Sequence, residues 1–330
     1  MCYSAQIWAD YRKFERLGGK LSLAEYTSLA GWTKMKGNWT KVVPKVMRRS
    51  MLEAHSFAPE LADEAASADV EGMKALEEEI LALEKRQGEA KEKLASSKPT
   101  KKAENDLRVS TNKIAAARKK LEEITSPATS NGIDRIWPGQ FAPVLVRDPE
   151  TGERLVIPMR YRCRLPGWDE AKEAEKPGTY NARRDKLSTV WRKVFGVHHG
   201  IMAVERFYES VHLHDLQRRE LAPGEGEQNV EIVFTPDTGE ALFVACLWTH
   251  TEGSGDDPGF FSFAAITDEP PPEVADAGHD RCIVTLREED IEAWLNPTVS
   301  TPSVLNTLLN AADRPYFEHE LAGSMKVTDE

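Results

Sequence analysis

The start of the chain carries two reactive groups on one residue once Met1 is removed. Aminopeptidases generally remove Met1 when the second residue is small, as Cys2 is, so the mature chain would begin with a thiol and an α-amine. An α-amine titrates near 7.7–8.0, so a useful fraction is neutral at physiological pH. The amine can add to an aldehyde to give an imine, and the thiol can close on that imine to give a thiazolidine. Cys2 therefore predicts aldehyde chemistry that no internal cysteine can perform.

Three polar residues further along the chain are candidates to assist this chemistry. Asn181 lies in Asn181-Ala182-Arg183, Glu209 follows the aromatic pair 207–208, and His279 follows a glycine. A carboxylate and an imidazole can move protons near neutral pH. Taken alone, each residue is explained more simply by a structural role, as a turn, an ion pair or a loop histidine.

Taken together, these segments resemble the SOS-response-associated peptidase (SRAP) family. The resemblance is carried, in the family's order, by Met1-Cys2-Tyr3-Ser4, Ile136-Trp137-Pro138-Gly139, Leu165-Pro166-Gly167-Trp168, Asn181-Ala182-Arg183, Arg206-Phe207-Tyr208-Glu209-Ser210 and His279-Asp280-Arg281-Cys282-Ile283. It covers the chain start and residues 133 to about 295. The chain departs from the family at Ser4, where arginine is frequent, at Ser210, where tryptophan is usual, and at 282–283, where Met-Pro is replaced.

The resemblance implies a protein that binds single-stranded DNA and crosslinks covalently to abasic sites. It implies that Cys2 is the nucleophile, that Asn181 orients it, that Glu209 is the general acid/base, and that His279 assists proton transfer. It also implies removal of Met1 by the protein itself and a weak lyase activity, without a metal or cofactor.

The same resemblance implies the DNA contacts. Arg183 and Arg281 would hold backbone phosphates beside the lesion. Flanking bases would stack on an aromatic ring, with Trp168, Phe207 and Tyr208 as the candidates.

Two other functions fit the sequence. The departures at Ser4 and Ser210 keep open an N-terminal-cysteine hydrolase that acts on an amide or peptide without DNA. A non-catalytic interaction module is the other alternative, in which a coiled-coil arm binds a protein partner and Cys2 is incidental. Replacing Cys2 by alanine would abolish either chemistry and leave docking intact.

Charge is distributed unevenly along a chain whose formal net charge is −11. Residues 221–330 hold 4 Lys/Arg against 22 Asp/Glu, whereas residues 154–193 hold 11 basic and 5 acidic residues. A polyanion is therefore expected on the basic segment and not on the C-terminal third.

Composition indicates a globular cytoplasmic protein. Hydrophobic residues make up 40% of the 330-residue chain, no apolar run is long enough to span a membrane, and residues 1–6 do not look like a signal peptide. The four cysteines form no CxxC pair, so we expect free thiols and no metal site.

The elements that must position these residues form an α+β fold. Residues 5–33 predict two short helices, with Ser22 and Glu25 spaced as in a capping box. Short apolar strands recur from residue 133 onwards and indicate a mainly antiparallel, barrel-like sheet, with a helix over 287–295.

Residues 69–125 have a different pattern. Apolar residues recur at heptad spacing in two stretches separated by Ser96-Ser97-Lys98-Pro99-Thr100, which predicts an antiparallel coiled-coil hairpin. We therefore expect a catalytic core formed by residues 1–60 and 127–330, with the hairpin inserted at 61–126.

Overall fold

The computed structural model describes residues 4–126, 131–255, 257–297, 300–311 and 314–322. The chain forms two compact units, one of Met1–Tyr26 with Ser130–Glu330 and the other of Thr27–Thr129. Residues 27–60 thus group with the hairpin by contacts. The assignment of residues 1–60 to a catalytic core remains a prediction about function, which compactness alone does not test.

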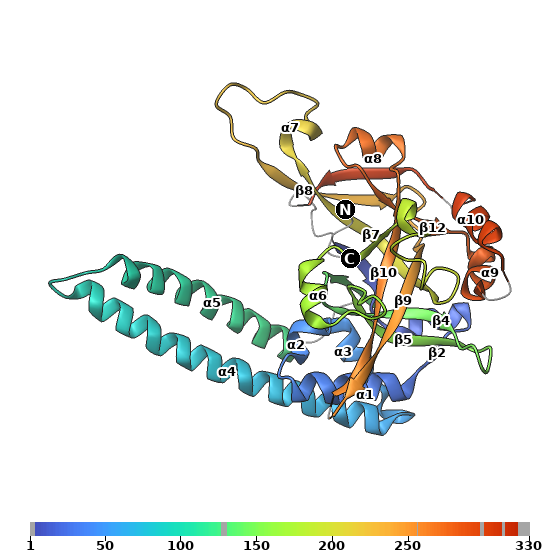
Figure 1. Ribbon diagram of the computed structural model, residues 1–330. Helices are drawn as coiled ribbons and strands as arrows, with labels where there is room; N and C mark the ends of the chain where they lie inside the picture. The colour runs from blue at the N-terminus through green and yellow to red at the C-terminus, as the bar shows by residue number, and fades with distance from the viewer. Residues whose placement is uncertain (1–3, 127–130, 256, 298–299, 312–313, 323–330) are drawn as a thin grey trace. The chain divides into compact units, whose positions relative to one another are not determined.

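A large mixed sheet forms the centre of the first unit (Figure 1). Its main strands are β1 (Ser4–Trp8), β3 (Ile133–Ile136), β4 (Phe141–Arg147), β5 (Arg154–Tyr161), β7 (His199–His212), β8 (Asn229–Pro236), β9 (Leu242–Ser254) and β10 (Asp257–Asp268). Its short strands are β2 (Lys20–Leu21), β6 (Asn181–Arg183), β11 (Cys282–Ile283), β12 (Thr285–Leu286) and β13 (Phe317–Leu321). The predicted α+β class is confirmed.

The sheet is open, in contrast to the barrel-like arrangement expected from the sequence. The strand path runs β12-β9-β10-β5-β4-β7-β1-β3, and β7 also pairs with β9. The β4–β7 and β10–β5 pairings comprise two residue pairs each, so these strands do not close a continuous barrel. Most pairings are antiparallel, but β2–β5, β5–β10 and β6–β10 are parallel, which makes the sheet mixed.

The beginning of the chain differs from the prediction. Residues 5–8 are not helical but form β1, which lies between β3 and β7 in the sheet. A short 3₁₀ helix (Tyr11–Leu17) follows, and α1 (Leu23–Met35) begins directly after Ser22, as predicted. Four to five residues are too few to show a helical or strand period, so partners distant in the sequence decide their conformation.

Short helices cover parts of the first unit. They are α6 (Glu170–Glu175), α7 (Leu213–Leu216), α8 (Pro272–Asp276), α9 (Ile291–Leu295) and α10 (Pro302–Asn310). The indole of Trp294 on α9 donates to the carbonyl of Gly200 on β7 at 3.1 Å, so the predicted 287–295 helix docks on the longest strand.

The second unit is helical and contains the predicted hairpin (Figure 1). It includes α2 (Trp39–Val42), α3 (Lys45–Leu52), α4 (Pro59–Ala95) and α5 (Lys101–Thr125). A narrow apolar seam joins the two long helices and contains Met73, Leu76, Ile80, Ala117, Leu121 and Ile124. The hydroxyl of Thr100 accepts from the backbone N–H of Ala103 at 3.2 Å and caps α5 directly after the predicted break.

Candidate active site

A buried carboxylate–imidazole pair lies in the first unit. Glu209 on β7 retains 1% of its surface exposed, and His279, which follows α8, retains 7%. The Nε2 atom of His279 lies 3.1 Å from Oε2 of Glu209. The two predicted residues, 70 positions apart in the chain, are therefore in direct contact.

The backbone around His279 fixes the direction of its ring. Gly278, which precedes it, has φ of 87°, and a Cβ there would lie 2.9 Å from Cβ of Asp215. Only glycine fits both this left-handed conformation and this close approach. The turn lets the Nδ1 atom of His279 reach the carbonyl of Arg281 at 2.8 Å.

These contacts restrict which atoms of the pair carry hydrogen. A carbonyl accepts only, so Nδ1 of His279 carries a hydrogen and donates it to Arg281. The 3.1 Å contact between Nε2 and the Glu209 carboxyl then needs a second proton, held either by the imidazole or by the carboxyl. The contact therefore joins a buried carboxyl to an imidazole whose other nitrogen is already engaged.

The predicted amide, Asn181, is placed by strand pairing. Its strand β6 runs parallel to β10, with Asn181 opposite Ala265 and Arg183 opposite Thr267. On its other side, β10 pairs with β11, with Thr267 opposite Ile283. The Asn-Ala-Arg segment and the segment after His279 therefore flank the same end of β10.

The side chain of Arg184, directly after β6, stabilises this register. Arg184 forms an ion pair with Asp268 at 2.7 Å, and its guanidinium also donates to the side chain of Asn310 at the end of α10. Asn181 itself is 6% exposed, so its amide is a buried polar group at the end of the sheet.

The predicted nucleophile, Cys2, lies outside the described residues. The structure begins at Ser4, which pairs with Tyr208, the neighbour of Glu209 on β7. The strand that carries the general acid/base candidate thus lies beside the strand that continues from the start of the chain.

The other three cysteines are buried free thiols. Burial raises the pKa of Cys163 to about 12. It also raises the pKa of Cys246, and it raises that of Cys282 to about 12, with a smaller contribution from the Glu209 carboxylate. Since the thiolate is the reactive form, none of these three is a good nucleophile.

The residues expected to contact DNA are spread over the first unit. Arg183 is exposed and forms an ion pair with Asp185 at 3.0 Å, whereas the side chain of Arg281 is only 18% exposed, with Asp280 at 4.0 Å. Trp168 is partly buried in the turn between β5 and α6.

Two of the aromatic rings considered for base stacking are not accessible. Phe207 is fully buried and packs on Phe234 and Phe317, with ring centroids 5.0 and 5.2 Å away. Tyr208 is 3% exposed, and the guanidinium of Arg135 lies over its ring at 3.6 Å. Their burial could not be predicted from the sequence, because the alternation of residues in a strand does not indicate whether its outer face is covered.

Arg135 is a residue that motif comparison alone missed. Its guanidinium donates two hydrogen bonds to the hydroxyl of Ser4, at 2.6 and 3.0 Å, and it forms an ion pair with Glu231 at 2.5 Å. An arginine from β3 thus lies on the first described residue of β1. Arg135 directly precedes the Ile136-Trp137-Pro138-Gly139 segment used in the motif comparison, but only the pairing of β3 with β1 shows what it touches.

Three arginines of the basic segment 154–193 contact one buried glutamate. Glu173 on α6 is 3% exposed and contacts Arg160 at 2.5 Å, Arg164 at 2.7 Å and Arg162 at 3.4 Å. Arg160 and Arg164 also lie over the Phe260 ring. The cluster keeps a net positive charge while its guanidinium groups are fixed in place.

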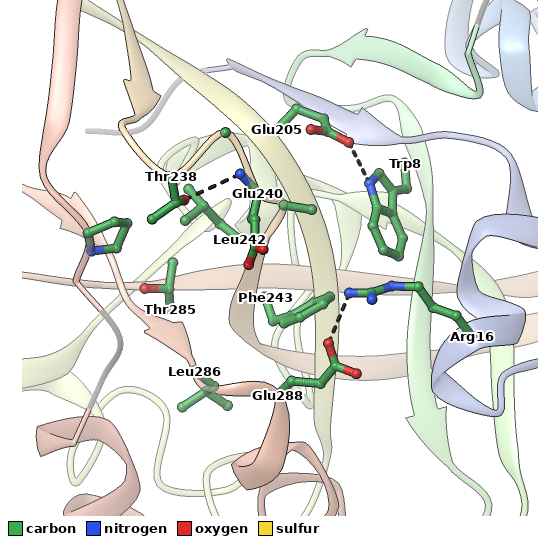
Figure 2. Close-up of a pocket in the computed structure, with 13 residues that line it drawn as sticks. Trp8, Arg16, Glu205, Thr238, Glu240, Leu242, Phe243, Thr285, Leu286 and Glu288 are labelled. Atoms are coloured by element: carbon green, nitrogen blue, oxygen red, sulfur yellow. Dashed lines mark hydrogen bonds and ion pairs between the residues drawn. The ribbon is translucent and has the colours of Figure 1, made fainter.

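A separate cavity of about 470 Å³ lies among β1, β9 and the 3₁₀ helix after β1 (Figure 2). Figure 2 shows Arg16 near Trp8 and Phe243, with Glu288 as its ion-pair partner at 2.9 Å. The indole of Trp8 donates to Glu205 at 2.7 Å. Glu205, Glu240 and Glu288 make this cavity acidic, which disfavours a nucleic-acid backbone there.

Within the described ranges, no group of three or more His, Cys, Asp or Glu side chains is arranged to hold a metal ion. In the same ranges, no helix has the length and apolar character needed to cross a bilayer.

Comparison with known proteins gives one family match. The model of the family described as SOS response associated peptidase (SRAP) matches residues 101–325, which include α5 of the hairpin. No curated protein matches the chain.

The solved structures include several similar chains. One is a protein from Bordetella bronchiseptica, with 23% identity and a TM-score of 0.44, covering 60% of this chain and 89% of that one. Another, from Bacteroides thetaiotaomicron, has 16% identity and a TM-score of 0.45, covering 57% and 76%. A phage-related protein from Bordetella bronchiseptica has 16% identity and a TM-score of 0.43, covering 60% and 85%.

Proposed function

Because the chain belongs to the SOS response associated peptidase (SRAP) family, we propose that it processes abasic sites in single-stranded DNA by a covalent crosslink through Cys2. The family's name connects the chain with the response to DNA damage and with peptidase-like activity. The family match begins after Cys2, so the nucleophile is assigned from the chain start. An abasic nucleotide has no base to unstack, so it can enter a protein site at little cost.

The observation that carries this proposal is the buried Glu209–His279 contact at 3.1 Å. It joins an imidazole to a carboxyl on β7, the strand that pairs with β1. The described part of β1 begins at Ser4, two residues after Cys2 in the sequence.

The proposed reaction has two bond-forming steps. The neutral α-amine of Cys2 adds to the aldehyde of the ring-opened deoxyribose, and the adduct loses water to give an imine. The thiol then adds to the imine carbon while its proton ends on the imine nitrogen, which gives a thiazolidine. Glu209 would protonate the departing hydroxyl and accept the amine proton, and His279 would share that proton through Nε2.

Two side reactions follow from the same groups. Hydrolysis of the Met1–Cys2 amide by the protein would free the amine and account for the peptidase activity. An imine that does not cyclise acidifies the neighbouring carbon, so β-elimination of the 3′ phosphate would cleave the strand. Arg183 and Arg281 would hold backbone phosphates, and Trp168 would stack on a base.

The test is incubation of the purified protein with single-stranded DNA that carries one abasic site, followed by a denaturing gel and intact mass spectrometry. We expect a species with Met1 removed and one DNA strand added. Cys2→Ala should abolish it, and Cys2→Ser should leave only a reducible imine. Cys246→Ala is the matched control, because it removes a buried thiol that plays no part.

A second pair of variants tests the proton transfer. Glu209→Gln keeps the shape of the side chain but removes its proton transfer, so crosslinking should slow by about 10²-fold or more. Glu205→Gln, on the same strand, should leave the rate nearly unchanged. Absence of any crosslink by protein that has lost Met1 would overturn the proposal and favour the N-terminal-cysteine hydrolase, which peptide substrates would then test.

A further inference from the structure

Trp137 is an exposed tryptophan beside the start of the chain. It directly follows β3, whose Ile136 is opposite Ala5 on β1, and it retains 38% of its surface exposed. Most large aromatic side chains of this unit are buried in its core. Its indole is therefore accessible to a ligand next to the proposed reactive end of the chain.

The backbone of Trp137 is held rigidly. Its N–H donates to the side-chain oxygen of Gln140 at 3.0 Å, and its carbonyl accepts from the Gln140 N–H at 3.0 Å. Pro138 and Gly139 occupy the central positions of this turn, and Gly139 has φ of 96°, as a type II turn requires. The Gly139 N–H also donates to the Tyr161 carbonyl at 2.7 Å, which ties the turn to the end of β5.

The indole rests on a guanidinium that is itself fixed. Arg135 lies 4.8 Å from the centroid of the Trp137 ring and 3.6 Å from that of Tyr208, so its planar group contacts both rings. Its hydrogen bonds to Ser4 and its ion pair with Glu231 hold it there. The ion pair with Glu231 balances the charge of Arg135. The main role of Arg135 is therefore to support the Trp137 ring, and not to bind a phosphate.

We infer that Trp137, supported by Arg135, is a stacking platform for an unpaired nucleobase next to the lesion. This inference rests on the proposed function for its substrate, single-stranded DNA. A fixed indole with exposed surface offers a base a flat, apolar partner, and base–aromatic stacking is tolerant of sequence. Since Arg135 also binds Ser4, a base on this platform would lie close to the end of the chain that bears Cys2.

The experiment measures binding to DNA that cannot react. A labelled single strand carries a tetrahydrofuran abasic analogue, which has no aldehyde, and its Kd is measured by fluorescence anisotropy. A second set of strands lacks, in addition, the base on the 5′ or the 3′ side of the analogue. Each strand is titrated with the wild-type protein and with Trp137→Ala, Trp137→Phe and Trp168→Ala.

We expect the effects of replacing Trp137 and of removing the flanking base to depend on each other. Trp137→Ala should weaken binding of the base-flanked strand by about 5-fold or more, and Trp137→Phe should recover most of that loss. Removing the stacked base should weaken binding to the wild-type protein by a similar factor and have no further effect on Trp137→Ala. Tyr316→Ala, at an aromatic residue that is 56% exposed, is the control and should leave every Kd unchanged.

The inference would be overturned if Trp137→Ala and removal of the flanking base weakened binding independently of each other. It would also be overturned if removing the base weakened binding to Trp137→Ala but not to Trp168→Ala. If Trp137→Ala fails to fold, Trp137→Leu, which keeps an apolar side chain without a ring, replaces it in the same measurements. The outcome is separable from the proposed function. If the protein crosslinks to DNA but Trp137 and the base act independently, only the stacking inference is wrong. If Trp137 and the base are coupled but no crosslink forms, only the proposed covalent reaction is wrong.

Discussion

Two buried histidines of the first unit have contrasting hydrogen-bond partners. His279 contacts a carboxylate through Nε2, so a proton on that atom is stabilised. His199 instead accepts from the Gly196 N–H through Nε2 at 2.9 Å, while Nδ1 contacts the Trp294 carbonyl at 3.0 Å. Burial lowers the pKa of His199 to about 3, so its ring stays neutral. The ring of His279 thus faces a carboxylate, whereas that of His199 contacts only backbone groups through its two nitrogens.

His199 should make the fold sensitive to acid. The unfolded ring titrates near 6.5 and the folded ring near 3, so between these values the unfolded state binds the extra proton. Stability from this residue is complete above pH 6.5 and falls on acidification, by up to about 1.4 kcal/mol per pH unit. Urea unfolding at pH 7, 6 and 5 measures this slope.

The control for this slope is His199→Phe, which keeps a ring to stack on Trp294 but cannot titrate. The variant should be less stable at pH 7 and lose less stability on acidification. His198, whose pKa burial also lowers, is present in both proteins, so the difference isolates His199. Parallel pH profiles for the two proteins would contradict the assignment.

At the scale of elements, α6 is attached to the sheet through one carboxylate. Glu173 lies within 4 Å of three arginines that follow one another at alternate positions from the end of β5. Removing a buried partner leaves the opposite charges uncompensated, which costs far more than loss of an exposed ion pair. The turn that carries Trp168 leads directly into α6, so this contact also holds the turn.

Glu173→Ala should therefore destabilise the first unit by about 3–5 kcal/mol. Glu170→Ala, at an exposed position on the same helix, should change stability by less than about 0.5 kcal/mol. Thermal unfolding of the two variants makes the comparison. Equal midpoints would mean that the arginine cluster does not hold α6.

The hairpin offers a second matched pair of positions. Ile80 lies in the seam between α4 and α5, whereas its neighbour Leu81 is 65% exposed. Ile80→Ala should cost about 2 kcal/mol of hairpin stability by leaving a cavity, and Leu81→Ala should cost less than about 0.5 kcal/mol. Hydrogen exchange of the α5 amides reports the difference, and equal exchange rates would rule out a seam at Ile80.

At the scale of the whole molecule, the uneven distribution of acidic and basic residues limits where a polyanion can bind. The C-terminal third is strongly acidic, and the cavity in Figure 2 contains three glutamates. The segment 154–193 is basic, but Glu173 and Asp185 already neutralise part of it. DNA affinity should therefore come from few phosphate contacts and depend only moderately on salt.

The salt dependence of DNA binding tests the two proposed phosphate contacts. For a single strand, each contact contributes about −0.7 to the slope of log K against log salt concentration. Arg183→Gln and Arg281→Gln should each make the slope shallower by about that amount. Arg287→Gln, whose guanidinium pairs with Glu289 and Asp290 in the acidic third, is the control. Unchanged slopes in the first two variants would remove these arginines from the interface.

The sequence by itself determined the features that depend on local spacing. Heptad spacing and the break at 96–100 predicted the helical hairpin of α4 and α5. Apolar runs predicted parts of β4, β5, β8, β9, β10, β11 and β12. Ordered short motifs indicated the family that the family model matches. These signals need only a few neighbouring residues, because helix and strand periods are local properties of the chain.

Only the tertiary structure decided the contacts between distant segments. It made residues 4–8 a strand, brought Glu209 to His279, buried Phe207 and Tyr208, and placed Arg135 between Ser4 and Trp137. None of these follows from spacing, since β1 takes its form from hydrogen bonds to strands more than a hundred residues away. Side-chain accessibility likewise depends on what covers a strand, which the packed sheet alone determines.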